Sequence, residues 1–198
     1  MVVSGLSALL FWSTRIHRRR RHRGIGHNEL QAIQTCLAYV DAQYDYADKD
    51  RTGAGAGVYA RRFVSQEGKR DGLYWPSARG EESPLGELFA KASREGYLPD
   101  EGRIPYHGYY YKILTGQGPA ATGGTADYIV HGKMIGGFAL VAYPAAYRNS
   151  GVMTFIVNHQ GTVFQKDLGP DSANLAEAMT SFNPGAGWKK VDVNEAAK

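Results

Sequence analysis

The sequence predicts a single α+β domain in which one N-terminal helix packs on a four- to five-stranded antiparallel meander. Three observations support this fold class. First, apolar residues near the N-terminus follow the period of a helix. Second, short runs rich in Tyr, Val, Ile, Phe and Thr come later in the chain. Third, turn residues such as Gly, Pro, Asn or His-Gly lie at the ends of each run. No helical pattern separates these runs, as parallel strands would require. The predicted strands are residues 109–114, 126–130, 136–143, 152–158 and 162–166.

The N-terminal helix is predicted to begin near Asn28. Asn is a favourable N-cap residue, and Glu29 in the first turn suits the positive end of the helix dipole. Apolar residues then recur every three or four positions, which is the period of a helix with one buried face. This predicted stripe contains Leu30, Ile33, Leu37, Val40 and Tyr44. We expect it to pack on the protein's own sheet and the helix to end before Gly53.

Two shorter helices and a central strand complete the predicted fold. One helix runs from Leu85 to about residue 95, and the other covers residues 170–179. Residues 152–157 are apolar on both sides of the strand, which predicts a central position covered on both faces. Phe182 and Trp188 are expected to fold back on the core.

The positive charge of the chain is concentrated near its N-terminus. The formal net charge is +4 over 198 residues, but six arginines within residues 15–23 contribute +6, so the remainder carries −2. Nucleic-acid-binding domains normally carry positive charge on the fold. We therefore expect no nucleic acid to bind through the folded domain.

The first 23 residues differ in composition from the rest. Residues 2–12 form an apolar run that is too short for a transmembrane helix, and it precedes the basic residues, whereas a secretory signal has the reverse order. We predict an apolar and then Arg/His-rich disordered leader over residues 1–23, one domain over residues 24–191 and a frayed tail over residues 192–198.

No established catalytic motif is present in the sequence, and the candidates for catalysis are individual residues. They are His107, Asp71 and Asp127, each next to a predicted turn. Histidines in turns are most often exposed and without a chemical role. Cys36 is the only cysteine, so no intrachain disulfide can form, and its helical apolar surroundings predict a small buried side chain.

A partial calcium-loop pattern follows the N-terminal helix. Asp48, Asp50 and Gly53 match positions 1, 3 and 6 of such a loop. Thr52 and Tyr59 occupy two positions where the loop needs acidic or amide ligands. We therefore expect no cofactor, and calcium binding at Asp48 and Asp50 is the weaker alternative.

A dense group of aromatic and polar residues is the best candidate for a binding site. Its members are Lys69, Arg70, Tyr74, Trp75, Tyr106 and Tyr110. Strand alternation places Tyr110 on the opposite face from Tyr109 and Tyr111. One face belongs to the core, and the other can present rings to a sugar, a peptide or a protein partner. The alternative is that these tyrosines cover the helix and the sheet edge.

Several motifs, in this order, resemble the bacterial domain of unknown function 2950 family. They are NELQAIQTCLAYVDAQYDYA, GKRDGLYWP, SPLGEL, EGY, PYHGYYYKILTGQGP, GKMIGGFALVAYPA, GVMTFIVNHQGTVFQKDLGP and the terminal GW. The resemblance covers residues 24–191. Members of this family are typically longer and begin with a secretion signal, so it implies a periplasmic or secreted protein whose C-terminal portion is similar to this chain.

A looser resemblance connects the chain to type IV pilin-like and pseudopilin domains. It rests on the opening NE-x-x-A-I followed by Ala42-Gln43-Tyr44, and on a closing hairpin with an Asn-x-x-Gly turn. It implies one N-terminal helix on an antiparallel sheet. The chain departs from these proteins because it has no prepilin leader.

These observations favour a non-enzymatic binding or structural module of the bacterial cell envelope, located outside the cytoplasm, with an envelope protein or polymer as its partner. The alternative is an envelope enzyme that acts on peptidoglycan or polysaccharide through His107 and nearby Asp and Tyr groups. A calcium-dependent adhesive module is the weaker alternative.

Overall fold

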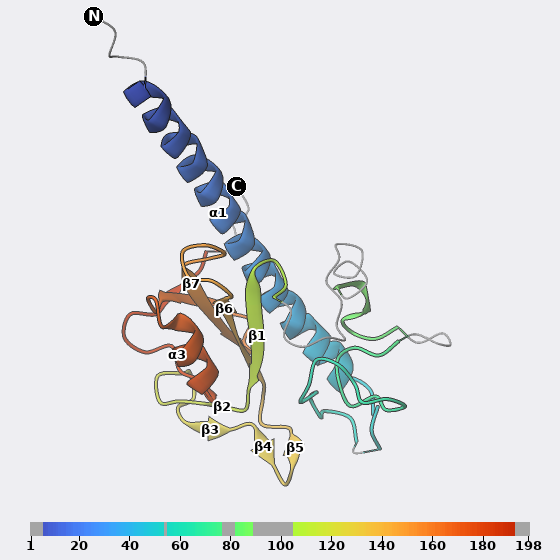
Figure 1. Ribbon diagram of the computed structural model, residues 1–198. Helices are drawn as coiled ribbons and strands as arrows, with labels where there is room; N and C mark the ends of the chain where they lie inside the picture. The colour runs from blue at the N-terminus through green and yellow to red at the C-terminus, as the bar shows by residue number, and fades with distance from the viewer. Residues whose placement is uncertain (1–5, 54, 77–81, 89–104, 193–198) are drawn as a thin grey trace, which may run out of the picture.

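A five-stranded antiparallel sheet lies between a long helix and a short one (Figure 1). The computed structural model describes residues 6–53, 55–76, 82–88 and 105–192. The strand order is β1-β6-β7-β8-β10, and each neighbouring pair is antiparallel. The strands are β1 (Tyr109–Leu114), β6 (Ala139–Pro144), β7 (Met153–Asn158), β8 (Phe164–Asp167) and β10 (Lys189–Lys190). The predicted α+β class with an antiparallel sheet is confirmed.

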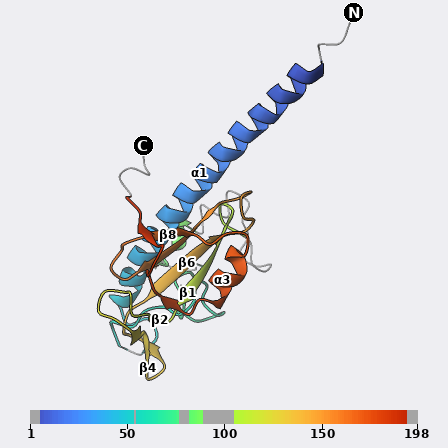
Figure 2. The ribbon, with the colours of Figure 1, turned by 90° about the vertical axis from the view of Figure 1, so that its left-hand side faces the viewer.

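Helix α1 (Leu6–Ala47) contains 42 residues, so the helix start predicted at Asn28 is wrong. The capping argument failed because Asn28 is used in a distant contact. Its side-chain Nδ2 donates a hydrogen bond to the Ser150 carbonyl oxygen at 2.9 Å. The helix continues through Gly24 and Gly26, around the place where it leaves the body of the molecule (Figure 2).

The chain leaves the main sheet between β1 and β6 and forms two small sheets. These contain β2 (Gly116–Gln117), β3 (Ala126–Asp127), β4 (Ile129–Val130), β5 (Lys133–Met134) and the later β9 (Ser181–Phe182). β2 pairs with β3 antiparallel and with β9 parallel, and β4 pairs with β5. The single meander strand predicted over residues 126–130 is therefore wrong. Asp127 Oδ1 accepts a hydrogen bond from the Ile129 N–H at 2.9 Å, and this local turn separates β3 from β4.

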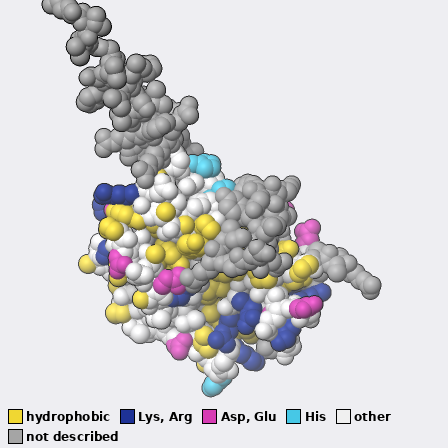
Figure 3. All heavy atoms as spheres, in the orientation of Figure 1, with side chains coloured by type: hydrophobic (Ala, Val, Ile, Leu, Met, Phe, Trp, Pro, Cys, Tyr) yellow, Lys and Arg dark blue, Asp and Glu magenta, His cyan; other side chains and the backbone are white. Residues whose placement is uncertain are grey.

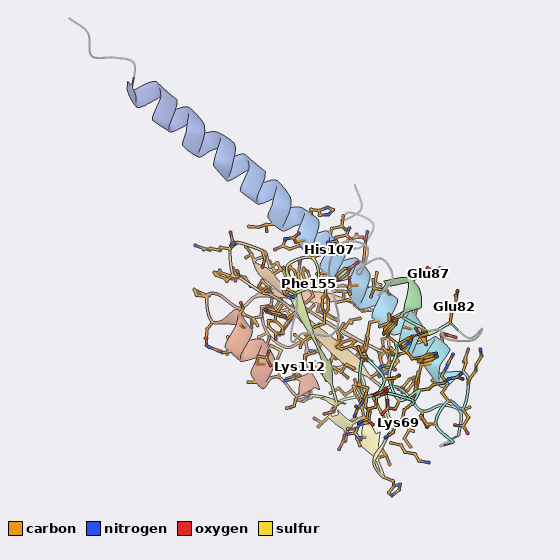
Figure 4. All side chains as sticks on the ribbon, turned by 45° about the vertical axis from the view of Figure 1, so that its right-hand side comes forward. Lys69, Glu82, Glu87, His107, Lys112 and Phe155 are labelled. Atoms are coloured by element: carbon orange, nitrogen blue, oxygen red, sulfur yellow. The ribbon has the colours of Figure 1, made fainter. Side chains whose placement is uncertain are left out.

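Helix α1 covers one face of the main sheet, mainly over β7 and β6, and α3 (Ser172–Ala178) covers the other face over β6. β7 is buried along almost its whole length, which confirms its predicted central position. On the α1 side, Tyr109 packs on Phe155, and the Tyr109 hydroxyl donates to the Met153 carbonyl at 2.9 Å. Figure 4 shows Phe155 between the helix and the sheet.

The buried face of α1 differs from the predicted stripe. Tyr44 is 44% exposed and Leu37 is only partly buried, whereas Gln43 is fully buried. The observed stripe follows helical spacing through Ala32, Cys36, Tyr39, Gln43 and Tyr46. Ile33 and Val40 of the predicted stripe are also buried. The apolar pattern missed the rest because Ala32 and Cys36 are small and Gln43 is polar.

The remaining predictions concern the other helices and the C-terminal residues. Residues 86–88 are helical, and the rest of the helix predicted to end near residue 95 lies outside the described residues. Phe182 is buried and Trp188 packs on the core, as predicted. Within the described part of the chain, no helix combines the length and apolar character needed to cross a bilayer.

Candidate functional site

The predicted binding residues lie in three separate parts of the molecule. Lys69, Arg70, Tyr74 and Trp75 lie near the C-terminal end of α1, Tyr106 lies nearer its middle, and Tyr110 lies on the opposite face of the sheet. The first group contacts α1 at Tyr46, and the second contacts it at His27 through His107. Nineteen residues separate these contacts, or about 28 Å along the helix. The structure does not bring the six residues together.

Trp75 belongs to the packing at the end of α1. It is 7% exposed, and the guanidinium carbons of Arg51 and Arg70 lie 5.6 and 5.7 Å from its ring centre. Arg51 Nη1 also donates to the Asp45 and Tyr46 carbonyl oxygens at 2.6 and 2.8 Å. Because the last carbonyls of a helix carry partial negative charge, Arg51 stabilises the helix end and Trp75 packs on it.

His107 lies at the junction between α1 and the start of β1, as Figure 4 shows. Its ring is 6.2 Å from that of His27 and 4.2 Å from that of Tyr106, and its backbone φ is 48°. The next residue must be glycine, because a Cβ on Gly108 would lie 2.8 Å from Ser150 Cβ. His107 therefore occupies a tightly packed turn.

The other two catalytic candidates each serve a local turn. Asp71 Oδ1 accepts from the Gln66 N–H at 2.9 Å, and Asp71 Oδ2 lies 3.8 Å from Arg62 Nε. Asp127 holds the turn between β3 and β4. None of the described contacts joins these carboxylates to each other or to His107. General acid–base catalysis needs its groups within hydrogen-bond reach of one reacting centre.

Tyr110 contributes to the layer between the sheet and α3. Its ring lies 5.7 Å from that of Tyr143, the residue opposite it on β6. The Tyr143 hydroxyl donates a short hydrogen bond to Glu177 Oε1 on α3. Lys112 Nζ donates to the Glu177 and Met179 carbonyl oxygens at the end of α3 (Figure 4). This group fixes α3 on the sheet, and the sequence alone did not reveal it.

The calcium and cysteine predictions concern residues in very different surroundings. Asp48 and Asp50 are exposed beyond the end of α1. Among the residues that the structure describes, no three or more His, Cys, Asp or Glu side chains are grouped to hold a metal ion. Cys36 is fully buried, as predicted, and burial raises the pKa of its thiol to about 12. The thiol is therefore protonated near neutral pH, which makes it a poor nucleophile.

The structure also forms a surface that the sequence did not indicate. We call it the basic–aromatic surface, and it consists of Tyr44, Tyr59, Arg61 and Lys133. The Tyr44 and Tyr59 rings are 6.2 Å apart, and the Tyr59 N–H donates to the Met134 carbonyl at 2.8 Å, which joins this segment to β5. Arg61 Nη1 donates to the Gly132 carbonyl at 3.3 Å. Figure 3 shows Lys and Arg side chains gathered in this lower part of the molecule.

Tyr44 is held in place although its side chain is exposed. Its hydroxyl donates to the His159 carbonyl at 2.6 Å, and its ring packs edge-on against Phe138 at 5.4 Å. Burial lowers the pKa of His159 and raises the pKa of Tyr59. The His159 ring and the Tyr59 hydroxyl are therefore neutral near pH 7.

Comparison with known proteins finds one family model that covers most of the chain. The family model described as "Protein of unknown function (DUF2950)" matches residues 11–191. The chain belongs to this family. The match to the DUF2950 family confirms the resemblance drawn from the motifs and begins before residue 24. No curated protein and no solved structure matches the chain. The likeness to pilins therefore stays a prediction.

Proposed function

We propose that this DUF2950 protein is a non-enzymatic structural or binding module of the bacterial cell envelope, located outside the cytoplasm. The observation that carries this proposal is the length of α1. The helix spans 42 residues, about 63 Å, whereas a six-residue strand such as β7 spans about 20 Å. Figures 1 and 2 show the N-terminal part of the helix extending away from the sheet.

A partner would stabilise the projecting part of the helix. In proteins most helical stability comes from tertiary packing of one helix face, and the projecting part lies away from the sheet. The described contacts of α1 with the sheet and its loops begin at His27 and Asn28 and continue to its C-terminal end. We infer that the stretch before residue 24 packs on another protein of the envelope, while residues 27–47 hold the domain.

The arrangement of polar residues supports a non-enzymatic role over a polymer-degrading one. Asp71 and Asp127 are used by their own turns, and His107 packs in a junction with α1. An enzyme site would need such groups to converge on one substrate atom. The location outside the cytoplasm is supported by the family resemblance.

Site-specific photocrosslinking in the native organism tests this proposal. A photoreactive amino acid at Thr14, in the projecting part of α1, should capture a discrete protein partner. The same amino acid at Asn149, an exposed residue in the loop before β7, is the matched control and should capture none. Equal capture at both positions, or none at Thr14, would overturn the structural role. Recovery of the full-length protein with cytoplasmic markers would overturn the location.

A further inference from the structure

The turn after β7 brings a histidine into the packing between α1 and the sheet. The His159 ring lies 5.7 Å from the Tyr128 ring and 6.2 Å from the Phe138 ring. Its backbone N–H donates to the Phe138 carbonyl at 3.0 Å, and its carbonyl accepts a hydrogen bond from the Tyr44 hydroxyl on α1 at 2.6 Å. His159 therefore joins three parts of the chain, which are the end of β7, the segment before β6 and the C-terminal half of α1.

One ring nitrogen of His159 is buried without a hydrogen-bond partner. Nδ1 is shielded from solvent, and no described side chain or backbone group pairs with it. The backbone of Gly137 packs directly against it, because a Cβ on Gly137 would lie 2.7 Å from Nδ1 and 2.9 Å from Tyr128 Cε1. A neutral ring tolerates this position when its proton is on Nε2, since Nδ1 then holds only a lone pair. A protonated ring carries a proton on both nitrogens, so a charged donor would be buried without an acceptor.

Within the described part of the chain, no charged group pairs with the His159 ring. The ionisable residues on the elements packed around it are Tyr39, Asp41, Tyr44, Asp45, Tyr59, Arg61, Asp127 and Tyr128. Tyrosine hydroxyls carry no charge between about pH 5 and pH 8. The carboxylates of Asp41, Asp45 and Asp127 form no ion pair with the ring. Burial accordingly lowers the pKa of His159, and the Phe138 carbonyl offsets this effect only in part.

We propose that the turn after β7 is an acid-sensitive latch on α1. When His159 gains a proton, its ring leaves the buried place beside Gly137 to reach water, and the shift of its backbone breaks the hydrogen bond from Tyr44. The folded protein favours the neutral ring. The stability that the latch contributes is therefore present above the usual histidine pKa of about 6.5 and is lost as the pH falls below it. This inference goes beyond the proposed function, because it gives the C-terminal half of α1 a response to pH.

His159→Phe in the full-length protein tests the latch by urea denaturation at about pH 7.5 and about pH 5. Phenylalanine keeps an aromatic ring and cannot be protonated, and it removes a nitrogen that has no partner, so the variant should stay folded. Between these two conditions the unfolding equilibrium constant should rise severalfold more in the wild-type protein than in His159→Phe. The upper limit for one histidine kept neutral in the fold is about 30-fold. The matched control His131→Phe changes an exposed histidine in the β4–β5 turn and should respond to pH as the wild-type protein does.

NMR of the wild-type protein follows the latch itself and needs no variant. The His159 ring should titrate with a midpoint below about pH 6.5. The proton–proton contacts between the Tyr44 and Phe138 rings, whose centres lie 5.4 Å apart, should weaken with the same midpoint. The contacts between the Tyr109 and Phe155 rings, whose centres lie 5.8 Å apart, are the control and should persist. In His159→Phe the contacts between Tyr44 and Phe138 should persist in acid as well.

A His159 midpoint at or above about pH 6.5 would overturn the proposal. So would contacts between Tyr44 and Phe138 that persist when the His159 ring is protonated, or an equal pH response of the wild-type protein and His159→Phe in urea. None of these measurements involves the projecting part of α1. A failure of the latch is therefore distinguishable from a failure of the proposed structural role.

Discussion

A single buried glutamine joins α1 to the loop that follows it. The Gln43 side chain is fully buried, and its amide nitrogen and oxygen are both hydrogen-bonded. Its Nε2 donates to the Tyr39 hydroxyl at 3.0 Å and to the Ala60 carbonyl at 2.8 Å, and the Ala60 N–H donates to its Oε1 at 2.8 Å. The Gln43 side chain thus pairs with both backbone groups of Ala60, as a neighbouring β-strand would. Buried polar networks that are fully paired specify one arrangement of the core.

Replacing Gln43 with leucine should lower the free energy of unfolding by about 2–4 kcal/mol. The leucine has a similar volume, but the Ala60 N–H and carbonyl become buried without partners. Gln34→Leu makes the same chemical change at an exposed position of the same helix and should cost less than about 0.5 kcal/mol. Urea denaturation measures both values. Equal stability of the two variants would show that the Gln43 network does not stabilise the fold.

At the scale of elements, one carboxylate couples α1 to the central strand. Glu29 Oε1 accepts hydrogen bonds from the Val152 and Met153 N–H groups at 2.9 and 3.1 Å, at the start of β7. Asn28 makes a parallel contact with Ser150. The helix is therefore attached to the sheet by polar contacts near its middle as well as by its apolar face farther along.

Glu29→Ala should loosen this attachment locally. We expect the amide protons of Val152 and Met153 to exchange with solvent at least about tenfold faster, because a charge-assisted hydrogen bond contributes about 1.5–3 kcal/mol. Hydrogen exchange followed by NMR measures this effect. Asp41→Ala, an exposed acidic residue on the same helix, is the control and should leave both amides unchanged. Unchanged protection in Glu29→Ala would show that the helix is held by apolar packing alone.

Most strands of the main sheet were predictable because their pattern is local. β1 has the predicted bounds, and β6, β7 and β8 lie within two or three residues of them. The strand predicted over residues 126–130 was wrong because strand propensity takes no account of the hydrogen bond that the Ile129 N–H donates to Asp127 Oδ1. This bond forms the turn between β3 and β4. The predicted helix start was wrong for a related reason. Asn28 is a common N-cap residue, but its side chain contacts a residue 122 positions away.

The candidate sites depended on contacts between distant parts of the chain, which a sequence pattern does not contain. Trp75 and Tyr110 both belong to predicted aromatic runs, but one packs at the end of α1 and the other beneath α3. Tyr44 looked like a core residue from its helical spacing and is exposed. Local patterns thus identified several residues that pack in the core, and only the fold showed which faces they share and which residues the patterns missed.

At the scale of the whole molecule, α1 consists of a packed part and a projecting part with two glycines near their boundary. A Cβ placed on Gly24 or Gly26 would meet nothing within 4 Å. Each glycine lowers helix stability by about 1 kcal/mol relative to alanine. The helix is therefore intrinsically weakest around the place where it leaves the body.

The double variant Gly24→Ala/Gly26→Ala should strengthen the helix by about 1–2 kcal/mol across this boundary. Trypsin cleavage after the arginines of residues 15–23 should slow severalfold, because cleavage follows the population of the locally unwound helix. Cleavage after Arg148, in an exposed loop of the same chain, is the internal control. An unchanged ratio of the two cleavage rates would show that the glycines do not weaken the helix.

Because β9 and β10 are made last, the two sheets that they complete stay unfinished until late in synthesis. β9 pairs with β2 and β10 pairs with β8, so residues 181–190 supply an edge strand to each of two sheets. At about 5–20 residues per second, a ribosome reaches residue 181 about 3–13 s after residue 116. During that interval β2 presents an unpaired edge to neighbouring nascent chains, and β8 does so for a shorter time, from its own synthesis until residue 189. The last strands to be made are thus the ones that protect the sheets from pairing with another molecule.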